Sequence, residues 1–351
     1  MRVRTAMYVL SVLALVGVVA SVSNAQNAAA RQPSSRVIVP HESWNCGMPA
    51  GIPSPEAGTL VFTAQMPLDR VAEVGKTQYG RRQVAVAGEG TVTGSKLSGT
   101  VMTGALDFEL TLDNGVVEVE LVMVVKTADG KYVFARSGGT GPDARDVRVV
   151  MDFEAPNASD AAWLNTGTFV ARRELNTAAK TMTVRVYDVS GVKPSTTPAD
   201  AIRISKPAGV PAQPWDYRRA GPGEKQGAQI ITERVTLSPS QSVGASKRGN
   251  RNIIPITGGE LSGRLTGKVI PGGADYQNLS QPATIDAHYL WQTMDGEIIV
   301  VRNGGTFGSL VPTFEARVGG PYEWLNKGLY LSSNPGPSTG GVALTFYEST
   351  R

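Results

Sequence analysis

Residues 285–302 read IDAHYLWQTMDGEIIVVR, and this stretch decides the fold class. Two runs rich in apolar, aromatic and β-branched residues flank the pair Asp295-Gly296. An Asp-Gly pair between such runs favours a tight β-hairpin, because glycine tolerates the positive φ that a primed turn requires. The stretch therefore predicts two antiparallel strands joined by a short turn.

The same pattern occurs earlier in the chain, where residues 127–136 surround Asp129-Gly130. The chain has 40 Gly and 22 Pro and many short apolar stretches, which favours strands joined by turns over helices. About eight strands fit into each half of the chain, and closing them into a barrel hides the edges of the sheet. We therefore expect an all-β fold of two tandem antiparallel, lipocalin-like β-barrel modules with little helix.

The two halves of the chain match one another in order, as tandem modules do. The offset between matched residues falls in small steps from 169 to 160 along the chain, as changes in loop length would produce. Chance matching would not keep this order. The matched pairs include Arg82 and Arg251, Asp107 and Asp275, Arg136 and Arg302, Glu154 and Glu315, Trp163 and Trp324, Asn165 and Asn326, and Tyr187 and Tyr347.

The repeat sets the expected boundaries of the modules. The first barrel is expected over residues 58–190 and the second over residues 227–351. Residues 191–226 are rich in Pro, Gly, Ala and Thr and are expected to form a linker, either slack or docked through its few apolar side chains. Residues 26–57 are expected to form an extended segment ahead of the first barrel.

The first residues predict export. A short basic start precedes an uncharged apolar run over residues 7–22, and Ser23-Asn24-Ala25 provides a small-x-small cleavage signal. We therefore expect a signal peptide over residues 1–25, cut near Ala25, and a periplasmic or secreted protein. No stable membrane anchor is expected, because the run is shorter than the roughly 20 residues of a spanning helix. Cys46 is the only cysteine, so no intrachain disulfide is possible.

Few residues offer the chemistry of the common enzyme classes. His41 and His288 are the only histidines, and no nucleophile elbow accompanies them. Two histidines and one cysteine without metal-like spacing argue against a metal site, and the lack of a phosphate-binding loop argues against a nucleotide cofactor. A net charge of +4 with scattered basic residues argues against nucleic-acid binding. We therefore expect no metal, no cofactor and no nucleic-acid partner.

The second half contains four motifs in a fixed order. They are residues 249–259 (GNRNIIPITGG), 265–276 (LTGKVIPGGADY), 300–303 (VVRN) and 322–326 (YEWLN). Together they resemble the DUF3237 (UPF0311) family, and the first half resembles a more diverged copy, with TGALD at 103–107 in place of the Pro-Gly-Gly-Ala-Asp turn. The resemblance implies a β-barrel fold. It also implies, through some fungal relatives, non-oxidative ring closure in natural-product pathways.

Polar residues that both copies share are the candidates for function. One interpretation is structural, with turn-capping side chains, paired Arg and Glu residues and a buried indole. The other is a pocket at a barrel mouth, where a carboxylate and a guanidinium orient a polar ligand against aromatic walls. In that pocket Asp275 or Glu315 would be a general base and Arg302 would hold developing negative charge. The ligand-binding candidates are Tyr276, His288, Trp324, Asn326 and Tyr347.

His288 leaves a further alternative open. It lies two positions from Asp286, so both side chains project to one face of a strand, which is either the barrel interior or the solvent side. In the interior, His288 would be a candidate acid or base near neutral pH.

The second module is the expected site of function. Residues 271–275 combine glycines, which permit backbone to lie close to a ligand, with a proline that stiffens the loop carrying Asp275. Three classes remain open: a cyclase, isomerase or lyase, a lipocalin-like binding protein, and a structural or interaction module. The expected partner is a small molecule, and the two modules are expected to pack as a pseudo-dimer.

Overall fold

The computed structural model of the protein describes residues 34–213, 215 and 218–351. The expected signal peptide, residues 1–25, lies outside the described residues. The described chain is almost entirely strand, with three short 3-10 helices and the four-residue helix α1 (Trp324–Lys327). The expectation of an all-β fold with little helix is confirmed.

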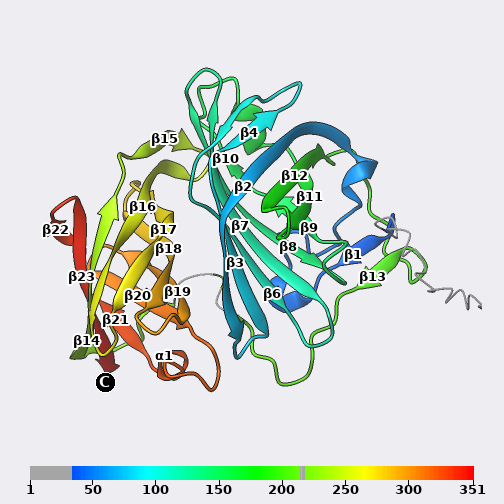
Figure 1. The fold of residues 1–351 in the computed structure, drawn as a ribbon. Coiled ribbons are helices and arrows are strands. Elements are labelled where there is room, and N and C mark those ends of the chain that lie inside the picture. Colours follow the sequence, from blue (N-terminus) through cyan, green and yellow to red (C-terminus); the bar gives the residue numbers. More distant parts are fainter. Residues whose placement is uncertain (1–33, 214, 216–217) are drawn as a thin grey trace, which may run out of the picture. The chain divides into compact units, whose positions relative to one another are not determined.

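Eight strands close the first barrel among the described residues (Figure 1). Each strand pairs antiparallel with the next, and β12 pairs with β2 to complete the circle. Two short strands, β4 (Gly90–Thr93) and β5 (Gly99–Val101), add a second connection between β2 and β7, and β10 (Phe153–Glu154) pairs with β8. The barrel strands are β2 (Thr59–Lys76), β3 (Arg81–Ala87), β6 (Ala105–Thr111), β7 (Val117–Thr127), β8 (Tyr132–Gly141), β9 (Arg148–Met151), β11 (Phe169–Asn176) and β12 (Thr181–Asp188).

The second barrel closes in the same way, through the pairing of β23 with β14. Strand β15 (Gln241–Ser246) pairs with β16, and β22 (Gly336–Ser338) pairs with β23. The barrel strands are β14 (Lys225–Leu237), β16 (Gly249–Gly263), β17 (Gly267–Asn278), β18 (Thr284–Thr293), β19 (Ile298–Thr306), β20 (Ser309–Glu315), β21 (Tyr330–Ser332) and β23 (Gly341–Thr350). Two tandem antiparallel barrels therefore make up the fold, as the sequence predicts.

The hairpin predicted from residues 285–302 is present. Strands β18 and β19 pair antiparallel up to Gln292 and Ile298. Gly296 in the connecting turn has a φ of +91°, and Gly130 in the equivalent turn of the first barrel has a φ of +84°. These values lie in the region that favours glycine, which is why the Asp-Gly pairs are informative.

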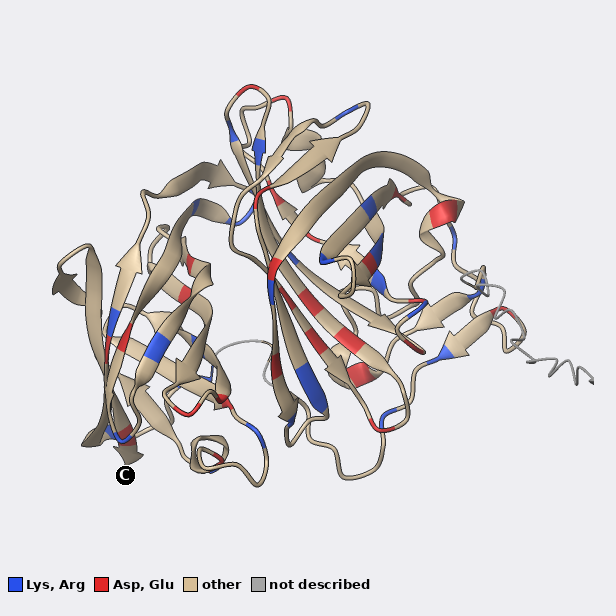
Figure 2. Ribbon diagram, viewed as in Figure 1, with Lys and Arg blue, Asp and Glu red and all other residues tan. Residues whose placement is uncertain are grey.

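Alternation along β18 divides its side chains between two environments. Tyr289 and Trp291 pack in the apolar core inside the second barrel. Leu290, on the opposite face, belongs to a buried apolar cluster that contains residues of both repeats, among them Phe108 and Val122. The outer face of this strand is therefore covered by the first repeat. Figure 2 shows that charged residues lie on the strands of the barrels as well as in the loops.

The segment before the first barrel and the segment between the barrels lie together. Strand β1 (Val37–Val39) pairs parallel with β13 (Ala201–Arg203). Farther along, the indole of Trp44 stacks on that of Trp215, with ring centroids 3.9 Å apart. The segment that joins the two barrels is thus docked through its apolar side chains, which was one of the two alternatives left open by its sequence.

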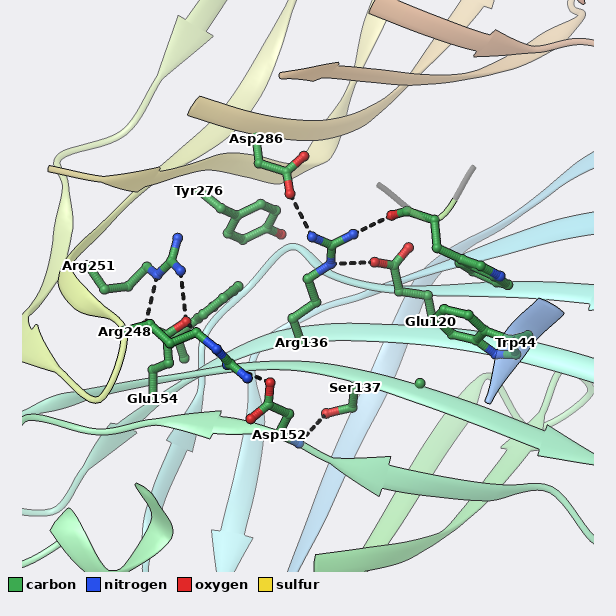
Figure 3. Close-up of a pocket in the computed structure, with 13 residues that line it drawn as sticks. Trp44, Glu120, Arg136, Ser137, Asp152, Glu154, Arg248, Arg251, Tyr276 and Asp286 are labelled. Carbon is green, nitrogen blue, oxygen red and sulfur yellow. Dashed lines mark hydrogen bonds and ion pairs between the residues drawn. The ribbon is translucent and has the colours of Figure 1, made fainter. Parts of the chain in front are cut away.

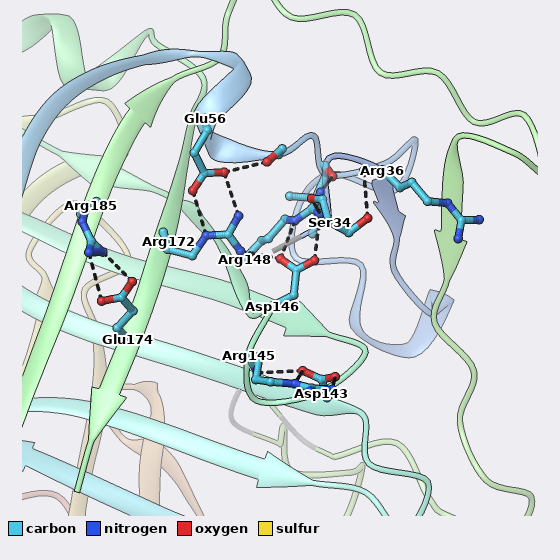
Figure 4. A network of polar contacts seen from close by, with 12 residues as sticks. Ser34, Arg36, Glu56, Asp143, Arg145, Asp146, Arg148, Arg172, Glu174 and Arg185 are labelled. Atoms are coloured by element: carbon cyan, nitrogen blue, oxygen red, sulfur yellow. Dashed lines mark hydrogen bonds and ion pairs between the residues drawn. The ribbon is translucent and has the colours of Figure 1, made fainter. Parts of the chain in front are cut away.

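Buried arginines hold the N-terminal segment against the first barrel (Figure 4). Arg148 is fully buried and donates to the backbone oxygens of Ile52 and Ser34 at 2.9 and 2.8 Å. Arg172 donates to Glu56, and both guanidiniums pair with Asp146. Charge-assisted bonds of this kind fix the segment in place.

Candidate functional site

A cavity of about 230 Å³ lies inside the second barrel. Most of its wall is apolar, and a few carboxyl and amide groups interrupt it. Mostly apolar cavities with a small number of polar groups are typical ligand sites. The apolar lining includes Val235, Leu237, Ile254, Ile256, Leu310 and Leu344.

Glu233 is the most deeply buried carboxyl group of this cavity. It lies on β14, is 0% exposed, and accepts hydrogen bonds from the Tyr289 hydroxyl at 3.1 Å and from Trp291 Nε1 at 2.9 Å. Burial raises the pKa of Glu233 to about 8, more than the two hydrogen bonds lower it. Glu233 is therefore mainly protonated at neutral pH.

Asp275 lines the same cavity from β17. Gln277 Nε2 donates to its Oδ2 at 2.9 Å, and burial raises the pKa of Asp275 to about 7. Asn303 on β19 donates to Ser332 Oγ at 3.1 Å. Among the described residues, Glu233 Oε1, Asp275 Oδ1 and Asn303 Oδ1 are buried and have no hydrogen-bond partner. Each buried polar atom without a hydrogen bond costs about 1–3 kcal/mol of stability, so these three oxygens are free to form hydrogen bonds with a ligand.

The equivalent aspartate of the first barrel is paired with an arginine. Asp107 is fully buried, and Arg173 on β11 donates to both of its oxygens, at 2.9 Å and 2.5 Å. Arg173 also pairs with Glu109. In the second barrel the corresponding strand, β21, ends at Ser332. Among the described residues that line the cavity with Asp275, none is an arginine.

Arg302 does not share the cavity with Asp275. Neighbouring residues of a strand point to opposite faces, so Asn303 lines the cavity and Arg302 faces outward. There Arg302 forms an ion pair of 2.5 Å with Glu120 on β7 of the first barrel. The guanidinium also lies over the ring of Phe108, 4.7 Å from its centroid.

Glu315 also faces the first barrel. Its carboxylate accepts hydrogen bonds from Arg82 Nε at 3.0 Å and from Thr77 Oγ1 at 2.7 Å. The three predicted catalytic residues thus lie on two sides of one barrel wall: Asp275 inside, Arg302 and Glu315 outside.

Tyr276 and His288 lie on the same outer face as Arg302. His288 is 0% exposed, and its Nε2 lies 2.8 Å from Oδ1 of Asp286. Its ring packs edge-on against Phe108 and Tyr276. The face shared by Asp286 and His288 is neither the barrel interior nor a solvent face, because the first repeat covers it.

The contacts between the repeats are reciprocal. Three interactions that residues of the first repeat make with the second are made again by the matched residues of the second repeat with the first. This is the pattern of an isologous, two-fold interface. The reciprocal pairs are Arg82–Glu315 and Arg251–Glu154, Thr77–Glu315 and Ser246–Glu154, and Arg136–Asp286 and Arg302–Glu120.

Opposite charges keep the carboxylates of this interface ionised. Burial alone would raise the pKa of Glu120, but the charges of Arg302 and Arg136 outweigh burial and lower it to about 2. Burial would likewise raise the pKa of Asp286, but His288 and Arg136 hold it well below its usual range. The interface network is therefore charged at neutral pH, whereas Glu233 inside the second barrel is mainly neutral.

A second cavity, of about 290 Å³, lies at this interface (Figure 3). In Figure 3, Arg251 points toward Glu154, and Arg136 lies between Glu120 and Asp286. Arg251 Nη2 donates to Glu154 Oε1 at 2.8 Å, and Arg136 Nη1 donates to Asp286 Oδ2 at 2.7 Å. Charged and aromatic side chains line this cavity, in contrast to the mostly aliphatic wall of the cavity inside the second barrel.

The glycines of residues 271–275 have a different role from the one expected. Gly272 and Gly273 have φ of +124° and +73° at a bulge of β17. They allow close approach to the first repeat: Gly273 N donates to Gly104 O at 2.8 Å, and a side chain at Gly272 would collide with Val86. The backbone thus lies against a protein surface at this point.

Trp324, Asn326 and Tyr347 lie outside both cavities. Arg264 covers the indole of Trp324, 4.1 Å from its centroid. Asn326 exchanges two hydrogen bonds with the backbone of Ala316, at 2.8 and 2.9 Å, and Asn165 does the same with Ala155. Tyr347 is half-buried on β23. These contacts are of the kind that the structural interpretation describes.

Sequence reasoning did not single out Glu233. The signal was a carboxylate inside the apolar strand 230–237, where the matched residue of the first repeat is Ala64. Glu120 was also missed, and Asp286 was considered only as a neighbour of His288, because the register of two barrels against each other leaves no local pattern.

Two further observations concern the described residues alone. In them, no group of three or more His, Cys, Asp or Glu side chains is placed to hold a metal ion. None of the helices in this part of the chain has both the length and the apolar character needed to cross a membrane.

A protein family matches both repeats, and individual relatives match a stretch about as long as one repeat. A family model described as "Protein of unknown function (DUF3237)" matches residues 57–190 and 228–309. A UPF0311 protein of Bradyrhizobium diazoefficiens is 40% identical over 114 residues, which cover 32% of this chain and 74% of that protein. A UPF0311 protein of Rhodopseudomonas palustris strain TIE-1 is 33% identical over 115 residues, with the same coverage of 32% and 74%.

Solved structures align with little more than a third of the chain. A conserved protein of unknown function from Rhodopseudomonas palustris has a TM-score of 0.33 at 25% identity, covering 37% of this chain and 95% of that one. A β-barrel-like protein from Acinetobacter baumannii has a TM-score of 0.33 at 17% identity, covering 37% and 94%.

Proposed function

The chain belongs to the DUF3237 family, and from that premise we propose that its second barrel binds a small, mostly apolar molecule that carries an uncharged oxygen group. One observation carries the proposal. The cavity of about 230 Å³ is apolar over most of its wall and is bordered by buried carboxyl and amide oxygens that lack hydrogen-bond partners among the described residues. A hydroxyl or carbonyl group in the ligand would use this capacity.

The protonation states of the two carboxyl groups in the cavity disfavour an anionic ligand. With a pKa of about 8, Glu233 is neutral at neutral pH and can donate its proton in a hydrogen bond. Asp275, with a pKa of about 7, is ionised in about half of the molecules. No arginine or lysine side chain is among the residues that line the cavity. An anionic ligand would therefore be buried without a counter-charge, which is costly.

Binding of naphthalenemethanol, measured by isothermal titration calorimetry, tests the proposal. Ala287 lines the cavity, and the matched residue of the first barrel is Leu121, fully buried in that barrel's core. Ala287→Leu should abolish binding, because it fills the second cavity with the side chain that the first barrel already has. Naphthoate should bind at least about tenfold more weakly than the alcohol.

Leu121→Ala is the matched control and should leave binding of naphthalenemethanol to the second barrel unchanged. Full binding by a folded Ala287→Leu variant would show that the ligand lies elsewhere. Equal binding of naphthoate would contradict the proposed selection by charge.

A non-oxidative acid–base reaction in the same cavity is the second candidate. Asp275 and Glu233 line the same cavity, and burial raises the pKa of both carboxyl groups into the range where either can take up or release a proton near neutral pH. Ionised Asp275 would take a proton from the carbon next to a ligand carbonyl, and neutral Glu233 would give its proton to the carbonyl oxygen, which yields an enol. Exchange of deuterium into tetralone in D₂O tests this, and Asp275→Asn should abolish the exchange. Unchanged exchange would exclude Asp275 as the base.

Export is proposed from the sequence of residues 1–25 alone. N-terminal sequencing of the protein recovered from a periplasmic or secreted fraction should begin near Gln26. A mature protein that retains Met1 would contradict export.

Paired packing of the modules as a pseudo-dimer is proposed from the reciprocal contacts, of which Arg82–Glu315 and Arg251–Glu154 are the best formed. Matched surfaces descended from one ancestral module would produce this pattern.

A further inference from the structure

The reciprocal interface contains two cavities that occupy matched positions. The cavity of about 290 Å³ is lined by Arg136, Arg251 and Glu154. A much smaller cavity, of about 10 Å³, is lined by their repeat partners Arg302, Arg82 and Glu315. Matched residues thus surround one open and one nearly closed cavity, so a different element must account for the change in volume.

Gln213, from the segment that joins the barrels, lines the closed cavity. It is 7% exposed, and its carboxamide oxygen accepts a hydrogen bond from Arg82 Nη2. Its carboxamide nitrogen donates to Glu118 Oε2 at 2.6 Å. A neutral amide therefore bonds at once to a guanidinium that lines this cavity and to the carboxylate of Glu118 beside it.

The open cavity keeps an unused donor. Trp215 lines it and is 6% exposed, and its Nε1 is buried without a hydrogen-bond partner among the described residues. Its stacking partner Trp44 donates its own Nε1 to Gly139 O at 2.9 Å. A buried indole N–H normally finds an acceptor, so this one marks a place for a ligand oxygen.

The charges around the open cavity favour a neutral ligand. Its lining holds the guanidiniums of Arg136, Arg248 and Arg251 and the carboxylates of Glu120, Asp152, Glu154 and Asp286. These groups pair with one another, so a charged ligand would meet a like charge close to each opposite charge. An amide offers an acceptor to the donors and a donor to the carboxylates without adding a charge.

We propose that the open interface cavity binds a small neutral amide, and that Gln213 is the chain's own occupant of the matched cavity. This site is separate from the one proposed inside the second barrel. The aromatic groups of Trp44, Phe134 and Tyr276 supply its apolar wall. An amide with a short apolar group attached therefore fits the open cavity.

Fluorine NMR of the full chain with trifluoropropionamide tests the proposal, because this probe has the carboxamide and the carbon chain length of the glutamine side chain. Apart from any signal that Ala287→Leu abolishes, which marks the cavity of the second barrel, the wild-type protein should give one bound signal. Gln213→Ala removes the internal occupant, so this variant should give a second bound signal. Trp215→Phe keeps the stacking on Trp44 but removes the indole N–H, and should weaken binding at the first site about tenfold.

Arg185→Met, on β12 of the first barrel and outside both cavities, is the control and should leave both signals unchanged. Circular dichroism establishes that each variant is folded. The absence of a bound signal in the wild type would overturn the proposal, as would unchanged binding in folded Trp215→Phe. A single signal in folded Gln213→Ala would show that the two cavities are not equivalent.

Discussion

The two barrels share a strand framework but differ in what lies inside. In the first, Asp107 is paired with Arg173, and Leu121 and Met123 belong to the apolar core. In the second, Asp275 has only Gln277 as a hydrogen-bond partner among the described residues, and Ala287 and Tyr289 occupy the positions of the leucine and the methionine. A few side chains therefore decide whether such a barrel has a packed core or a cavity.

The polar groups follow the same division. The first barrel neutralises its buried acid with a permanent opposite charge. In the second, burial raises the pKa of Glu233 to about 8 and that of Asp275 to about 7, so Glu233 is mainly neutral and Asp275 is ionised in about half of the molecules. A paired acid is a structural element, whereas a buried unpaired acid that titrates near neutral pH is characteristic of a functional site.

The largest expected effect is the pH dependence of stability caused by Glu233. Its pKa is about 8 in the folded chain, against 4.5 for a glutamate side chain in water. Between these values the folded chain holds a proton that the unfolded chain has lost, so the free energy of unfolding falls as pH rises. The free energy of unfolding falls by about 5 kcal/mol at most, because a difference of one between the folded and unfolded pKa corresponds to about 1.36 kcal/mol. Urea unfolding at pH 5 and pH 8 should show that the free energy of unfolding of Glu233→Gln rises relative to that of the wild type between the two pH values.

Glu120→Gln is the control for this experiment. Because the pKa of Glu120 is lowered to about 2, its contribution to stability is complete above the unfolded value of about 4.5. The difference between this variant and the wild type should therefore stay constant from pH 5 to pH 8. A constant difference for Glu233→Gln would mean that Glu233 is ionised in the folded protein.

The second effect concerns the packed barrel. Arg173→Met leaves the buried carboxylates of Asp107 and Glu109 without their counter-charge, and should reduce the free energy of unfolding by about 3–5 kcal/mol. Arg185→Met, which removes the more exposed pair with Glu174, should cost less than about 1 kcal/mol. If the two variants unfold at the same urea concentration, the buried network does not stabilise this barrel.

The third effect tests whether the interface is reciprocal in energy as well as in geometry. Double-mutant cycles on Arg82–Glu315 and Arg251–Glu154, with Met and Gln as replacements, should each give a coupling of about 2 kcal/mol. Two similar couplings would support the pseudo-dimer. A coupling near zero in one cycle and a large one in the other would argue against equivalent contacts.

The smallest effect separates structural from functional asparagines. Asn165→Ala and Asn326→Ala each remove two hydrogen bonds to the backbone and should cost about 1–2 kcal/mol, by similar amounts. Binding of naphthalenemethanol should be unchanged in both variants. Weaker binding in Asn326→Ala alone would show that Asn326 takes part in ligand binding.

The fold could be predicted because its determinants are local. The Asp129-Gly130 and Asp295-Gly296 turns fix two hairpins by backbone conformation, and alternation along residues 285–302 assigns each side chain to a face. The repeat then extends the argument from one half of the chain to the other. These signals require no knowledge of distant contacts.

The candidate site could be predicted only in part. The sequence singled out Asp275 and its strand, but it grouped Asp275 with Arg302 and Glu315, which the structure places on the opposite side of the barrel wall. Residue spacing gives the face of a strand, but it does not say what covers that face. The covering surface here is the first repeat, which turns an outer face into a buried, charged interface.

The sequence by itself therefore determined two tandem barrels, their turns and the family to which they belong, because hydrogen-bonded strands and tight turns depend on nearby residues. Only the tertiary structure decided which barrel has a cavity, that Glu233 borders it, and that Gln213 closes one of two matched interface cavities. These features arise where segments far apart in the chain meet. Volume and pKa at such places depend on packing from every side, and no local pattern records that packing.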